Sequence, residues 1–146
     1  MKKMIKNLII PCIIVFLFAI VYLIIIPKMR YQNALNNIFT KFEEGLTNLE
    51  INYEKIEVDS TIFGAKRAYS YTSNEKTIML YVYSNNSKYY NQGLKDGFVK
   101  SQNNDDSRLY GVMNNNCILY MESEFPKDIE VLELFQNLSK EYLDAM

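Results

Sequence analysis

The sequence predicts an α+β protein in which an N-terminal transmembrane helix precedes a small domain with a four- or five-stranded antiparallel sheet and helices on one face. Three observations support this prediction. An uncharged apolar run lies near the N-terminus, and two later segments repeat apolar residues with the period of a helix. Between those segments, β-rich runs occur in pairs separated by short polar turns, which is typical of hairpins and hence of an antiparallel sheet.

The apolar run has the length of a membrane span. No charged residue occurs from Asn7 to Pro27, and Leu8 to Ile26 contains fifteen Leu, Ile, Val or Phe residues. Nineteen helical residues extend about 28 Å, close to the ~30 Å thickness of the hydrocarbon core. A cleaved signal peptide would have a shorter apolar region followed by a small-x-small site, which this run lacks. We therefore expect residues 1–27 to be an uncleaved transmembrane signal anchor that ends at Pro27.

The charges beside the run predict its orientation. Lys2, Lys3 and Lys6 precede it, whereas Lys28 and Arg30 follow it. Because the more basic flank tends to stay in the cytoplasm, we expect the domain of residues 28–146 to be extracytoplasmic. The predicted location is the cell membrane, with a single pass.

A second helix is predicted directly after the anchor, within residues 28–50. Its apolar residues recur at helical spacing on one face: Leu35, Ile38, Phe39, Phe42, Leu46 and Leu49. This face either packs on the chain's own domain or forms a juxtamembrane coiled coil that dimerises the protein. Two heptads are too few to favour the coiled coil, and the oligomeric state stays open.

The first β-rich region follows this helix. Short strands are predicted at Ile51–Tyr53 and Ile56–Val58, and a hairpin is predicted from Lys66–Thr72 and Thr77–Ser84. A short helix should begin at Ser84 or Asn85, run through Leu94 and stop at Gly97.

The last third of the chain predicts a second hairpin and a final helix. The hairpin joins Arg108–Met113 to Cys117–Glu122 around three asparagines, and the helix covers about Asp128 to Asp144. Two hairpins joined through a helix favour an antiparallel sheet with helices packed against it.

Tyrosine is the only enriched residue type that suggests a binding surface. Tyr69, Tyr71, Tyr81 and Tyr83 lie in the first hairpin, and their arrangement depends on its register. An odd number of turn residues would place all four on one face, as an aromatic platform able to stack on a sugar or on a partner side chain. An even number would split the cluster and leave ordinary cross-strand packing.

Composition excludes several kinds of site. The chain has no His, so neither a His-containing triad nor a His-ligated zinc site can form, and no nucleotide-binding glycine pattern occurs. We predict no catalytic, cofactor-binding or metal-binding residues. All 17 acidic residues and 13 of the 16 basic residues lie after Pro27, so the domain carries a net charge of −4, which argues against nucleic acid as a partner.

These observations predict a non-enzymatic, single-pass membrane protein that presents a small α+β interaction domain outside the cytoplasm to a protein partner or a component of the cell envelope. One alternative is an accessory or enzymatic domain that acts on a cell-envelope polymer through the tyrosine face. The other reverses the orientation and makes the domain a membrane-tethered regulator that faces the cytosol.

Overall fold

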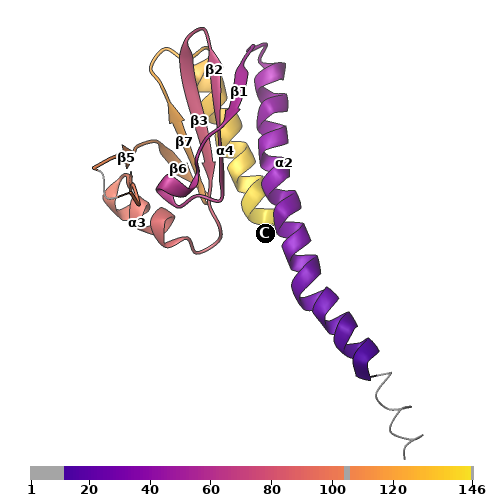
Figure 1. Ribbon diagram of the computed structural model, residues 1–146. Helices are drawn as coiled ribbons and strands as arrows, with labels where there is room; N and C mark the ends of the chain where they lie inside the picture. The colour runs from indigo at the N-terminus through magenta and orange to yellow at the C-terminus, as the bar shows by residue number, and fades with distance from the viewer. Residues whose placement is uncertain (1–11, 104–105, 146) are drawn as a thin grey trace, which may run out of the picture.

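The computed structural model describes residues 12–103 and 106–145 and confirms the α+β class. A long apolar helix leads into a five-stranded antiparallel sheet with helices packed against it (Figure 1). The lysines from which the orientation was predicted, Lys2, Lys3 and Lys6, lie outside the described residues, as does the start of the apolar run.

The predicted anchor and the predicted juxtamembrane helix form one uninterrupted helix. It covers Cys12–Asn48 and includes a π-helical segment, η1 (Val21–Ile25), followed by α2 (Ile26–Asn48). Pro27 therefore does not end the apolar helix, contrary to the prediction. Just before the proline, the Ile26 N–H bonds to the Val21 carbonyl, and this wider π turn shifts the hydrogen-bond register so that the helix passes a residue that lacks an N–H.

The main sheet has the strand order β1-β2-β3-β7-β6, and all neighbouring strands are antiparallel. The strands are β1 (Glu54–Glu57), β2 (Arg67–Ser73), β3 (Lys76–Val82), β6 (Val112–Asn114) and β7 (Cys117–Met121). The hairpin of β2 and β3 turns at Asn74 and Glu75, which both have positive φ angles, 49° and 63°. Two such residues form the type I′ turn that suits the twist of a hairpin.

Both long helices cover the same face of the sheet. In Figure 1, α2 and α4 (Asp128–Ala145) lie side by side against it. The apolar face of α2 is buried here, with Phe42 and Leu46 fully enclosed together with Tyr71 and Phe135. This face packs on the chain's own domain, so it is not available for the alternative coiled coil.

Helices cover both faces of the sheet, which corrects the prediction of helices on one face only. The opposite face carries a second cluster in which Tyr90, from the short helix α3 (Lys88–Asp96), packs with Tyr81 and Ile118. The 3₁₀ turn η2 (Thr61–Phe63) contributes Phe63 to this cluster. The alternation of apolar side chains in β3 and β7 supplies both clusters, because successive residues of a strand point to opposite faces.

The predicted strand Arg108–Met113 is divided into two. Its first part, β5 (Arg108–Leu109), pairs with β4 (Val99–Lys100) in a separate two-stranded ladder, whereas β6 pairs with β7. Gly111 lies between the parts, where a Cβ atom would come within 2.5 Å of the Leu119 carbonyl oxygen. Only glycine allows this close approach of the chain to β7.

Candidate functional site

The structure divides the four tyrosines of the predicted binding face between the two sides of the sheet. Tyr69 lies opposite Leu80 and Tyr71 opposite Ile78, which is the register in which the cluster splits. The two-residue turn at Asn74 and Glu75 is the cause, because an even number of turn residues produces this pairing. Tyr69 and Tyr71 join the face covered by α2 and α4, whereas Tyr81 and Tyr83 face α3.

Burial also prevents these tyrosines from forming an exposed platform. Tyr71 and Tyr83 are 0% exposed and Tyr81 is 4% exposed. Tyr69 is half-buried, with its ring edge-to-face with Phe39 at 4.8 Å between centroids and the Lys55 ammonium 4.0 Å from its centroid. The tyrosines are therefore packing residues, and the candidate site lies elsewhere.

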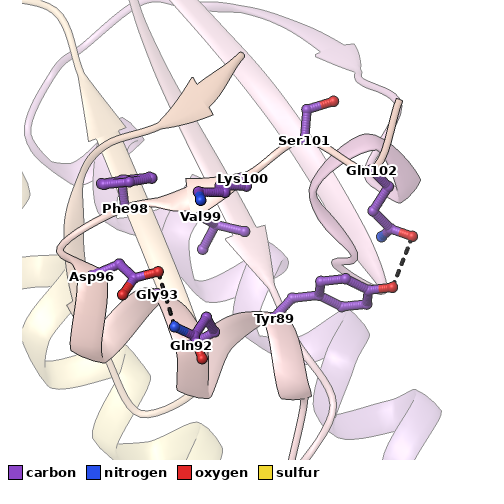
Figure 2. A pocket seen from close by; sticks show the side chains of 9 residues that line it. All are labelled: Tyr89, Gln92, Gly93, Asp96, Phe98, Val99, Lys100, Ser101 and Gln102. Carbon is purple, nitrogen blue, oxygen red and sulfur yellow. Dashed lines mark hydrogen bonds between the residues drawn. The ribbon is translucent and has the colours of Figure 1, made fainter. Parts of the chain in front are cut away.

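A cleft of about 290 Å³ opens between α3 and the chain segment that follows it (Figure 2). This volume lies near the lower end of ligand pockets, which span roughly 300–1,000 Å³. The side chains that matter for its chemistry come from α3 on one wall and from the returning chain on the other: Tyr89, Gln92 and Asp96, then Phe98, Lys100 and Ser101.

Local sequence signals build the α3 wall. The helix was predicted to begin at Ser84 or Asn85, but the Ser87 side chain caps it by accepting a hydrogen bond from the Tyr90 N–H. Gly97 ends the helix in the left-handed conformation, which confirms the predicted stop. Gly93 lets the returning strand approach closely, because a Cβ atom there would lie 2.6 Å from the Val99 side chain. Helix and strand therefore pack tightly at the base of the cleft.

Hydrogen bonds fix one end of the cleft. The Tyr89 hydroxyl donates to the Gln102 side-chain oxygen at 3.0 Å, and the Gln102 amide donates to the Thr61 carbonyl at 2.8 Å. The Tyr89 ring lies against Gly64, where any side chain would meet it. These contacts tie α3 to η2, so this wall is held in place in the free protein.

The charges inside the cleft are balanced. Asp96 accepts a hydrogen bond from the Gln92 amide at 3.0 Å, and both side chains are exposed to solvent. Lys100, on the opposite wall, forms no salt bridge to Asp96 in the described structure, although both line the cleft. One carboxylate and one ammonium thus remain available to a ligand.

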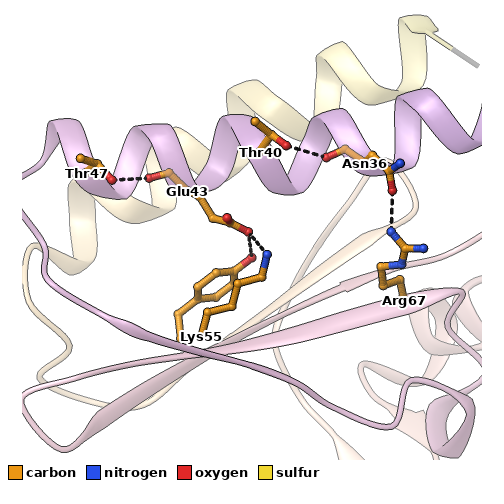
Figure 3. A network of polar contacts seen from close by, with 7 residues as sticks. Asn36, Thr40, Glu43, Thr47, Lys55 and Arg67 are labelled. Carbon is orange, nitrogen blue, oxygen red and sulfur yellow. Dashed lines mark hydrogen bonds and ion pairs between the residues drawn. The ribbon is translucent and has the colours of Figure 1, made fainter.

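A polar network on the other face of the sheet is structural (Figure 3). Glu43 of α2 accepts a hydrogen bond from the Tyr71 hydroxyl at 3.1 Å and pairs with Lys55 of β1 at 2.6 Å. Burial, followed by the charge of Glu43, raises the pKa of Tyr71 well above its usual value. The phenol therefore stays protonated at physiological pH and connects the helix to the sheet.

The buried cysteine is not placed for nucleophilic chemistry. Cys117 is fully buried, and burial raises the pKa of its thiol, so it is a packing residue and not a nucleophile. Within residues 12–103 and 106–145, no group of three Asp, Glu, Cys or His side chains is arranged to hold a metal ion.

Sequence reasoning did not identify the cleft, since its two walls meet only through the reversal at Gly97. One signal was visible: Asp96 precedes this glycine at the C-terminal end of a helix, where a negative charge is unfavourable. Comparison with protein-family models, with curated proteins and with solved structures finds no match to this chain.

Proposed function

We propose that this chain is a non-enzymatic, single-pass protein of the cell membrane that presents its α+β domain outside the cytoplasm to a protein partner or an envelope component. The observation that carries the proposal is a helix whose exposed apolar part continues into the buried core of the domain.

The exposed part of this helix is suited to lipid. Its large apolar side chains have no packing partners in the domain: Phe16, Phe18 and Leu23 are 66%, 70% and 70% exposed. Such a surface is unfavourable in water and favourable in hydrocarbon. The helix also satisfies its own backbone hydrogen bonds, which a chain inside a bilayer requires.

Helix continuity would hold the domain close to the bilayer. Ala34, the first buried residue of α2, follows Pro27 by seven residues, which is about 10 Å along the helix axis. The polar headgroup layer of one leaflet is roughly 5–8 Å thick. The domain would therefore sit beside the membrane surface on a stiff stem and not on a flexible linker.

Membrane insertion is tested by placing charges in the middle of the apolar run. Replacing both Ile14 and Leu17 with lysine should move the chain from the carbonate-resistant membrane pellet to the soluble fraction, because each lysine costs about 2.5–3.5 kcal/mol at the centre of a span. The control replaces the exposed residues Asn37 and Thr40 with lysine. If wild-type protein is itself extracted by carbonate, the anchor proposal fails.

Orientation is tested separately with protease on intact cells that carry a tag at the C-terminus. The proposal predicts loss of the tag under conditions that leave a cytoplasmic control protein uncut. A tag that survives while a known outer protein is digested would support the cytosol-facing alternative instead.

A further inference from the structure

We propose that the cleft between α3 and β4 binds a neutral saccharide segment of one or two rings. This inference goes beyond the proposed membrane anchoring. It rests on the geometry of the cleft, and its test does not depend on the orientation of the chain in a membrane.

Charge selects the class of ligand. The carboxylate of Asp96 and the ammonium of Lys100 line the same cleft without pairing with each other, so the charges of the two ionised side chains that line it offset each other. A strongly anionic or cationic polymer would meet a like charge on one wall. A neutral ligand rich in hydrogen-bonding groups would engage both walls.

The polar groups suit hydroxyls in particular. Asp96 is an acceptor, Lys100 is a donor, and both the Gln92 amide and the Ser101 hydroxyl can donate and accept. Each hydroxyl of a sugar also donates and accepts at the same time. The Gln92 and Asp96 side chains lie next to each other, joined at 3.0 Å, which is the arrangement needed to reach two vicinal hydroxyls.

An aromatic ring supplies the apolar wall. Phe98 lines the cleft, and the Arg108 guanidinium lies 4.7 Å from its ring centroid. Tyr110 also contacts this ring, at 5.4 Å between centroids. Figure 2 shows Phe98 and Lys100 on the wall across from Gln92 and Asp96. The C–H groups of a sugar ring would pack on this wall while its hydroxyls reach the opposite one.

Asp96 supports a binding role because it contributes little to the stability of the fold. It is the last residue of α3, where the helix dipole disfavours a carboxylate. Its hydrogen bond with Gln92, four residues earlier in the helix, lies on an exposed surface and is a weak contact of the kind that stabilises helices only slightly. A residue that is unfavourable for the fold and faces a cleft is expected where function requires it.

The test uses the full chain in lipid nanodiscs and three probes, N,N′-diacetylchitobiose, cellobiose and free alanine, with binding measured by saturation-transfer NMR titration. We expect saturable binding of at least one disaccharide. Asp96→Asn and Lys100→Met should each weaken it roughly tenfold or more, because each removes a charged hydrogen-bonding group. Asp96→Asn should leave the melting temperature equal to or above that of the wild type.

The matched controls make the same chemical changes on α4, on the other side of the sheet. Glu133→Gln and Lys140→Met alter exposed residues and should leave binding unchanged. Three results would overturn the proposal: no saturable binding of either disaccharide, undiminished binding by both cleft variants, or binding of free alanine while both disaccharides are inert. The last result would identify a site for zwitterions.

Discussion

At the scale of single residues, Tyr71 shows how a side chain that suggests binding becomes a structural one. Its ring is buried between α2 and the sheet, edge-to-face with Phe42 at 5.4 Å, and its hydroxyl reaches Glu43. Sequence alone identified the tyrosines but not their surroundings, because the side of the sheet on which they lie depends on one turn.

Removing the hydroxyl of Tyr71 should therefore destabilise the domain. We expect Tyr71→Phe to lower the free energy of unfolding by about 1–2 kcal/mol, since the lost hydrogen bond has a charged acceptor. Truncation to alanine should cost about 3–5 kcal/mol through the cavity that it leaves. Urea unfolding of the full chain in detergent, followed by tyrosine fluorescence, measures both. Tyr110→Phe, at a residue that is 52% exposed, is the control.

At the scale of elements, the turn between β2 and β3 has the largest effect, because it sets the register of the hairpin and so the face of the sheet on which each tyrosine lies. The sequence predicted both strands and left the register open, because Ser73–Lys76 is compatible with either an odd or an even turn. The observed turn has Glu75 at φ 63°, a left-handed conformation that is unfavourable for a residue with a side chain.

Glu75→Gly should stabilise the domain by about 0.5–1 kcal/mol, because glycine adopts positive φ without steric cost and is favoured at this place in a type I′ turn. The comparison is Glu54→Gly in β1, where the same change should destabilise a strand. Urea unfolding distinguishes the two. Destabilisation by Glu75→Gly equal to that by Glu54→Gly would contradict the observed turn.

The long helix is the second feature at this scale. Pro27 was predicted to end the membrane helix because a proline removes a hydrogen bond, and the prediction failed because a π turn absorbs the disturbance. Patterns of apolar residues do not reveal such a turn.

A continuous helix makes a sharp prediction for distances. Spin labels at Tyr22 and Asn37, in a chain with both cysteines replaced, should be separated by about 22 Å of helix axis and give one narrow distance distribution. Two glycines inserted after Pro27 provide the control and should broaden the distribution. An equally broad distribution without the insertion would show that the helix breaks at the proline.

At the scale of the whole molecule, apolar periodicity predicted the α+β class, an antiparallel sheet of four or five strands and the helical segments on either side of the sheet in the sequence, but not that the first two segments form one helix. It could not predict that α3 covers the second face, because this depends on how the chain reverses at Gly97 and pairs β4 with β5. The cleft arises from the same reversal. Asp96 and Lys100 are close in sequence, but only the folded chain places them on opposite walls of one cleft.

Buried tyrosines throughout the domain predict its response to alkali. Burial raises the pKa values of Tyr71, Tyr83 and Tyr142 in the folded state, whereas the unfolded chain ionises near its ordinary value of about 10. Their contribution to stability is therefore complete below about pH 10 and is lost as the pH rises further. We expect the urea midpoint to fall above pH 10, together with the appearance of phenolate absorbance. Reversible ionisation of every tyrosine near pH 10 without unfolding would contradict this burial.

The central claim is that the apolar N-terminal segment stays attached as a membrane anchor. The intact mass of the chain recovered from washed membranes tests it most directly. If the segment is retained, the chain in the membrane fraction will have the mass of the sequence above, 17.2 kDa. A shorter product that begins beyond residue 27 and is found in the aqueous fraction would contradict it.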